Sequence, residues 1–126
     1  EHTEARMLQT LGKRFDADQI ARCFSVCQEE GIAYHAFLLL GGPGEDRHSI
    51  QRAVEFLSRF EPALVNVSVG IRLYPGCALT RVAMEEGQLS PDADLLTPRF
   101  YLAPGVRDWI WEYIDGIVAA DPRWGY

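Results

Sequence analysis

The chain has 126 residues, enough for one domain, and its 48% hydrophobic and 24% charged residues are typical of a globular protein and not of a disordered one. A net charge of −6 argues against nucleic acid or an anionic membrane surface as the main partner. The longest apolar run is much shorter than the roughly 20 residues of a membrane span, and three cysteines do not suggest a disulfide framework, so we expect a reducing, cytoplasmic location.

Two helices are predicted first. One covers Thr3 to Leu11 and ends at Gly12 as a left-handed cap. The other begins at Asp16, which forms a capping box with Gln19, and ends near Gly31. Its apolar face comprises Ile20, Cys23, Phe24 and Cys27. The spacing of the two cysteines would allow a metal pair, but their place in the apolar face predicts core packing instead.

A strand, a glycine-rich loop and a third helix follow. Ile32 to Leu40 is apolar with little alternation, which predicts a strand buried on both sides, as in a parallel sheet. The loop Gly41 to Glu45 leads into a helix that Asp46 can cap and Pro62 ends.

Ala63 to Tyr74 has the clearest strand pattern. Alternate residues from Val65 to Leu73 are apolar, and those between them are polar or glycine. The apolar face should lie under helices, whereas the polar face needs water, a partner or a ligand. A parallel barrel wall that faces a polar lumen would satisfy this pattern.

The rest of the chain predicts a helix near Ala78 to Glu86, an irregular stretch, and a last amphipathic helix. We divide the chain into a segment 1–104 and a C-terminal helix and tail, 105–126. Trp111 and Trp124 lie outside the apolar stripe of the last helix, so we expect them to contact parts of a larger protein.

The predicted fold class is α/β, with parallel strands and covering helices. Two strands with a helix between them form a βαβ unit with a right-handed crossover. Two strands alone cannot cover the apolar faces of this many helices, so we expect the chain to be a fragment of a larger sheet. A further short strand within Leu95 to Leu102, or a second copy of the chain, would be an alternative way to complete it.

Two groups of residues are candidates for ligand contact. The loop with Gly41, Gly42, Gly44 and Glu45 lies where a strand ends and a helix begins, the edge at which α/β folds bind ligands. A tight turn that only needs glycine is the alternative. Arg72 and Tyr74, at the end of the second strand, suit an anionic or polar ligand unless Arg72 pairs with a carboxylate.

Several segments, taken in order, resemble one family. They are Met7-Leu8, Leu11-Gly12-Lys13, Cys27, Gly31-Ile32, Leu38 to Glu45, Gly70 to Gly76, Glu86-Gly87, Asp94-Leu95-Leu96, Pro98 and Phe100-Tyr101-Leu102. Together they resemble the C-terminal half of a radical S-adenosylmethionine enzyme, most closely the kind that carries a cobalamin-binding domain.

The resemblance implies a partial (β/α)₆ barrel of the TIM type, to which this chain gives the last two strands. In that family S-adenosylmethionine lies across the top of the barrel. The loop residues named above would contact its nucleoside, and Glu1 would contact the ribose. Asn66, Ser68, Arg72 and Tyr74 would line the substrate lumen.

The family's C-x-x-x-C-x-x-C motif, which binds a [4Fe–4S] cluster, is not present here. Cys23 and Cys27 have its first spacing, but Glu30 stands at the third position. We therefore assign no catalytic and no metal-binding residue, and expect the fragment alone to be inactive. The resemblance implies a parent enzyme with S-adenosylmethionine, the cluster and, in the variant it looks most like, cobalamin. Its radical chemistry would act on a small-molecule or lipid-like substrate, with methyl transfer as one outcome.

The partner of the chain would then be the rest of the barrel or a second copy. Two other hypotheses remain open at this point. One is a non-catalytic α/β binding or dimerisation module. The other is a phosphate- or nucleotide-binding protein, which the absence of a lysine near the loop disfavours.

Overall fold

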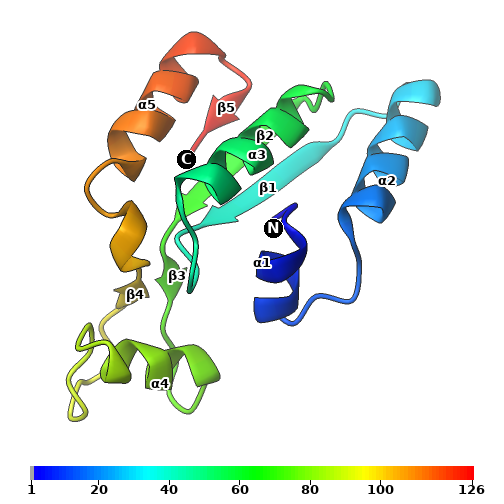
Figure 1. Cartoon of the computed structure of the whole chain (residues 1–126). Helices are drawn as coiled ribbons and strands as arrows, with labels where there is room; N and C mark the ends of the chain where they lie inside the picture. Colours follow the sequence, from blue (N-terminus) through cyan, green and yellow to red (C-terminus); the bar gives the residue numbers. More distant parts are fainter. Residues whose placement is uncertain (1) are drawn as a thin grey trace.

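A three-stranded parallel sheet forms the centre of the computed structural model, which describes residues 2–126 (Figure 1). The order is β1-β2-β5, and the strands are β1 (His35–Leu40), β2 (Leu64–Val69) and β5 (Trp124–Gly125). In the register of the first pair, Phe37 lies beside Asn66 and Leu39 beside Ser68. The predicted α/β class with parallel strands and covering helices is confirmed.

The helices begin and end close to the predicted positions. They are α1 (Ala5–Thr10), α2 (Ala17–Glu29), α3 (Arg47–Ser58), α4 (Ala78–Glu85) and α5 (Ile110–Ala120), with a 3-10 turn η1 (Pro104–Val106). Asp16 and Asp46 both form capping boxes, with Gln19 and Ser49 respectively. Gly12 and Gly31 have left-handed φ angles of 69° and 65°, as helix-ending glycines require. No helix in the described part of the chain is long and apolar enough to cross a membrane.

One face of the sheet carries the core. Ala36, Leu38 and Leu40 of β1 and Val65 and Val67 of β2 are buried, and helices α3 and α5 cover them. The residues that those helices contribute are Ile50, Ala53, Val54, Leu57, Ile110 and Ile114. The last helix therefore belongs to the same core as the strands. The boundary at residue 104 stays a prediction.

The prediction that the first strand is buried on both sides is wrong. The strand begins at His35, and its burial alternates: Ala36 and Leu38 are buried, whereas His35 and Phe37 are exposed, Phe37 by 63%. Because both faces of this strand carry apolar residues, the sequence does not show that their burial alternates. The second face of the sheet is open, and it presents a large aromatic side chain.

The predicted strand Ala63 to Tyr74 is divided in two. Gly70, with a φ of 88°, ends β2, and the chain continues as β3 (Ile71–Arg72). This short strand pairs antiparallel with β4 (Phe100–Tyr101) and not with the main sheet. A Cβ at Gly70 would lie 3.3 Å from the carbonyl oxygen of Tyr101, so the close crossing of the two segments also favours glycine. The strand considered within Leu95 to Leu102 thus exists, but it extends a separate two-stranded ribbon.

Trp124 corrects a further prediction. It is only 4% exposed and lies in β5, where it pairs with Val65 of β2. A two-residue strand has no periodicity to read, which explains why the third parallel strand was missed. Trp111 is 48% exposed, and its ring lies 6.1 Å from that of Tyr126.

Replacing Trp124 with alanine should lower the free energy of unfolding by about 3–5 kcal/mol, because it removes a buried aromatic side chain and the packing of β5. Trp111→Ala is the matched control and should cost less than about 1 kcal/mol. Urea unfolding of the chain, followed by circular dichroism, measures both. Equal losses for the two variants would contradict the placement of β5 in the core.

Candidate functional site

The glycine loop connects β1 to α3 at the carboxyl edge of the sheet, as predicted. Gly41 and Gly44 have φ angles of 94° and 76°, a region that L-residues with side chains rarely adopt. A Cβ on Gly41 would collide with Leu102, and one on Gly42 would lie 2.5 Å from Cε of Met7. Packing within the chain therefore already requires these glycines. Of the loop residues, only Pro43 and Gly44 reach the surface.

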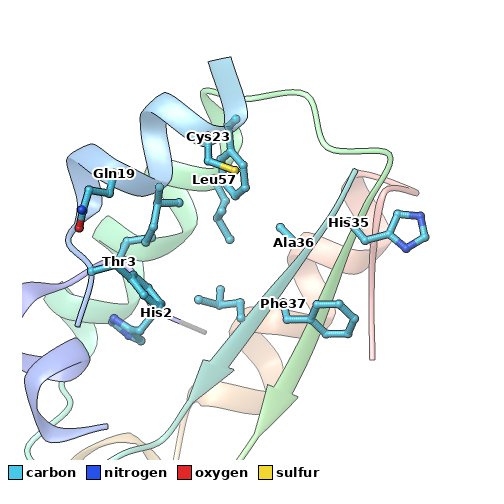
Figure 2. Close-up of a pocket in the computed structure, with 12 residues that line it drawn as sticks. His2, Thr3, Gln19, Cys23, His35, Ala36, Phe37 and Leu57 are labelled. Carbon is cyan, nitrogen blue, oxygen red and sulfur yellow. The ribbon is translucent and has the colours of Figure 1, made fainter. Parts of the chain in front are cut away.

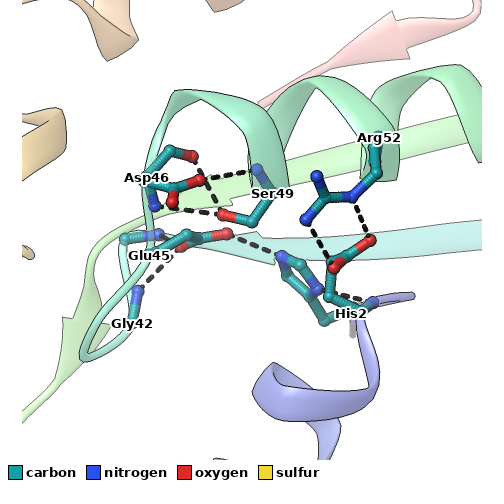
Figure 3. Close-up of polar contacts among 8 residues, drawn as sticks. His2, Gly42, Glu45, Asp46, Ser49 and Arg52 are labelled. Atoms are coloured by element: carbon teal, nitrogen blue, oxygen red, sulfur yellow. Dashed lines mark hydrogen bonds and ion pairs between the residues drawn. The ribbon is translucent and has the colours of Figure 1, made fainter.

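Glu45 is buried at 3% exposure and folds back onto its own loop. One carboxylate oxygen accepts hydrogen bonds from the backbone N–H groups of Gly41 and Gly42, the latter at 2.9 Å. The other oxygen lies 2.6 Å from Nε2 of His2, and both side chains are fully buried (Figure 3). Three donors thus surround one buried carboxylate, as a charged group inside a protein requires.

The second ring nitrogen of His2 fixes its tautomer. The backbone N–H of Glu4 points to Nδ1 at 3.0 Å. Because a backbone amide can only donate, Nδ1 must accept, which places the proton of a neutral ring on Nε2, where it donates to Glu45. His2 is therefore a neutral donor that links the N-terminal segment to the loop.

A second contact holds the same segment. Glu4 and Arg52 of α3 form a two-pronged ion pair with both N–O distances at 2.8 Å, and Arg52 lowers the pKa of the Glu4 carboxyl below its usual value. The predicted ribose contact, Glu1, lies outside the described residues. Its neighbour His2 is anchored directly against the loop predicted to contact the nucleoside.

In the sequence, His2 shows no spacing that assigns it a partner. It is satisfied, but by a residue 43 positions away. No local spacing of residues in the sequence predicts such a pair. The only signal was the combination of a glutamate after a glycine turn with a histidine near another predicted ligand contact.

The predicted lumen residues divide into two groups. Asn66 and Ser68 lie on the open face of β2 beside Phe37 and Leu39 of β1. Arg72 lies beyond the turn at Gly70, so the polar face is not one continuous strand as predicted.

Arg72 and Tyr74 form an exposed pair beyond that turn, with the guanidinium 5.1 Å from the centre of the Tyr74 ring. No carboxylate of residues 2–126 pairs with Arg72. Its charge is therefore available to a ligand.

The cysteines do not form a metal site. Cys23 and Cys27 lie on α2, and Cys77 precedes α4. Within residues 2–126 no three potential ligands of the histidine, cysteine, aspartate or glutamate type come together. The prediction that Cys23 packs in the core is wrong, since it is exposed.

Glu45→Ala should destabilise the chain by about 3–5 kcal/mol, because the mutation leaves buried N–H groups of Gly41, Gly42 and His2 without an acceptor. Glu45→Gln keeps an acceptor oxygen and should cost clearly less. Glu29→Ala, at an exposed glutamate of α2, is the control and should change stability by less than about 0.5 kcal/mol. Urea unfolding of the three variants compares them, and a neutral Glu45→Ala would refute the role of the carboxylate in holding the loop.

Comparison with known proteins supports the resemblance at the level of the fold. No protein family matches the chain by sequence, and no curated protein is significantly similar to it. The fold is similar to the radical S-adenosylmethionine methyltransferase TsrM from Kitasatospora setae, in a structure with tryptophan substrate and the analogue aza-SAM bound. That alignment has a TM-score of 0.72 at 19% identity and covers 98% of this chain. A second TsrM structure, with cobalamin and a [4Fe–4S] cluster bound, gives a TM-score of 0.72 at 18% identity over 98% of this chain.

The chain spans 31% and 32% of the length of the TsrM chains in these two structures. Almost all of its residues are aligned, so the likeness is not confined to one βαβ unit. The chain therefore shares its fold with about a third of a radical S-adenosylmethionine methyltransferase.

Proposed function

We propose that this chain is the C-terminal part of a radical S-adenosylmethionine enzyme and supplies part of its barrel wall. The observation that carries the proposal is the match of nearly the whole chain to a methyltransferase of that family. The ordered motifs of the sequence support it independently, because they suggest the same family without reference to coordinates.

The shape of the sheet supports a place in a barrel. One face is covered by α3 and α5, while the other is open and exposes Phe37. An open parallel sheet is unusual, because parallel sheets are normally covered on both faces. In a closed barrel this face would line the lumen, and the rest of the barrel would keep it from bulk water.

The nucleoside contact is proposed for the surface part of the glycine loop, Pro43 and Gly44. Gly41, Gly42 and Glu45 are buried beneath it and maintain its shape, and His2 fastens the loop to the segment that follows the predicted ribose contact. The loop would therefore contact a nucleoside through its rigid backbone surface and not through charged side chains. Its lack of lysine and of free carboxylates agrees with a largely uncharged adenosine partner.

The described residues do not fit a [4Fe–4S] cluster, which needs three or four converging thiolates. We assign the cluster, and any cobalamin, to other parts of the enzyme. In the complete protein those groups would supply radical chemistry on S-adenosylmethionine. This chain would contribute binding, orientation and exclusion of water.

The substrate is proposed to be a small molecule with an anionic or polar group and an apolar body. Asn66 and Ser68 supply hydrogen-bonding groups and Phe37 supplies apolar surface on the same open face, whereas Arg72, beyond the turn at Gly70, supplies an exposed cation.

The reading frame upstream of the chain gives the first test. A C-x-x-x-C-x-x-C motif should occur roughly 100 to 200 residues before residue 1, about one further domain. After reconstitution with iron and sulfide, the full-length protein should bind S-adenosylmethionine. A parent sequence without these cysteines would end the proposal.

The loop assignment can be tested in the same protein. Gly44→Val should weaken binding of S-adenosylmethionine by about tenfold or more in calorimetry, because a side chain at this surface position obstructs the nucleoside. Gly12→Val is the control for left-handed strain alone, since its φ is 69° and a Cβ there would meet no atom within 4 Å, whereas a Cβ at Gly44 would also contact Arg6. The same affinity loss in both variants would mean that strain and not contact is responsible.

A further inference from the structure

Helix α1 packs across the glycine loop through two neighbouring residues. Met7 is buried, and its Cε lies where a side chain of Gly42 would be. Arg6 covers the next exposed glycine of the loop. Its Nη2 touches the position that a Cβ of Gly44 would take, and Cζ and Nη1 lie 3.0 and 3.6 Å from that position. A ligand that approaches Gly44 therefore meets the guanidinium of Arg6 first.

The Arg6 guanidinium has unused hydrogen-bond donors. The residue is exposed, and no carboxylate of residues 2–126 pairs with it. Two carboxylates near the loop are already engaged, because Glu45 binds His2 and Glu4 binds Arg52. An arginine carries five N–H donors and stays charged throughout the physiological pH range. The cation over Gly44 is therefore available to a ligand.

A cavity of about 460 Å³ between α2 and β1 also borders the N-terminal segment, and Figure 2 shows its lining. His2 and Thr3 contribute to it, yet none of the lining residues is an arginine, lysine, aspartate or glutamate. Most of the lining is apolar, and in the proposed barrel the neighbouring part of the enzyme fills this space. The unpaired cation and the exposed glycine thus lie together at the loop and not in the cavity.

We propose that Arg6 is the base-stacking residue of the nucleoside site. The adenine ring lies on the side of the guanidinium that faces away from Gly44. This inference rests on the proposed function and adds to the loop a side chain from α1. A guanidinium is planar and weakly hydrated for a cation, so it stacks well on flat rings, and proteins hold nucleobases in this way.

Charge decides which part of S-adenosylmethionine lies against Arg6. The sulfonium is a cation, which a guanidinium repels. The adenine ring is uncharged, and the face of an aromatic ring attracts a cation. The carboxylate of the ligand could also pair with an arginine. Adenosine contains the base but neither the sulfonium nor the carboxylate, so it separates the two contacts.

Calorimetry on the full-length protein with adenosine and with S-adenosylmethionine tests the proposal. Arg6→Ala should weaken the binding of both ligands by a similar factor of about ten, because both contain the base. Arg22→Ala removes an exposed arginine of α2 and is the control, which should change neither affinity. A loss confined to S-adenosylmethionine would overturn the proposal in favour of the carboxylate contact. Unchanged affinity for both ligands would remove Arg6 from the site.

Two other substitutions of Arg6 separate a flat surface from a charge. Arg6→Tyr keeps a planar ring and should retain most of the affinity for adenosine, whereas Arg6→Lys keeps only the charge and should lose it. Weaker binding in Arg6→Tyr than in Arg6→Lys would contradict stacking.

Gly44→Ala tests the same contact from the loop. The added Cβ would push the flexible Arg6 side chain aside, so the variant should lose affinity for adenosine as Arg6→Ala does. The two losses should not add in the double variant, because both remove one contact. Gly12→Ala has a similar φ of 69° with open space around it, and should leave the affinity unchanged. Fully additive losses would contradict the proposal.

The radical function is judged by a separate measurement, since adenosine can be bound without a cluster. A full-length protein that assembles no iron–sulfur cluster, but loses adenosine affinity on Arg6→Ala, would refute the proposed function and support the stacking contact. A protein that assembles the cluster and binds S-adenosylmethionine equally well with and without Arg6 would do the reverse. No measurable binding of adenosine would also overturn the stacking contact, because the base would then contribute too little.

Discussion

The buried carboxylate of Glu45 is the contact on which the proposed site depends. It binds the N–H groups of Gly41 and Gly42 on one side and the imidazole of His2 on the other. A carboxylate can be buried in this position because both of its oxygens receive hydrogen bonds. The same three bonds hold the loop conformation and the position of the N-terminal segment. A rigid loop loses little entropy on binding, which favours ligand affinity.

The sheet, in contrast, is covered by helices on one face only, and its outer strands β1 and β5 have no further strand partner among the described residues. Its covered face is a conventional core, but its open face exposes Phe37 and its free edge leaves backbone groups unpaired. Helix α2 is amphipathic, yet none of its residues is buried, so this helix also lacks a packing neighbour. Helix α2 and the free edge of β1 border the same cavity, so one missing neighbour explains both. The fold match to part of a larger methyltransferase agrees with that explanation.

Much of the fold could be predicted because it depends on local signals. Asp16, Asp46, Gly12 and Gly31 mark helix ends by their own chemistry, and the apolar spacing within α3 and α5 defined their packing sides. The errors arose where tertiary contacts decide. Gly70 ends a strand whose alternation continues beyond it, and Trp124 forms a strand too short to have a pattern.

The site was only partly predictable for the same reason. The glycine loop was found from its residues, but its partner His2 is distant in sequence and no motif connects the two. Arg72 and Tyr74 were expected on one strand with Asn66 and Ser68, and the turn at Gly70 separates them. Long-range pairs of single residues leave no periodic trace in one sequence, so only the folded chain reveals them.

A structure of the full-length protein with S-adenosylmethionine bound would test the central claim most directly. We expect the adenosine to lie against Pro43 and Gly44, over a loop still held by Glu45 and His2, with one strand of the remaining chain paired to β1. A nucleoside bound elsewhere, with this loop in solvent and the edge of β1 unpaired, would contradict it.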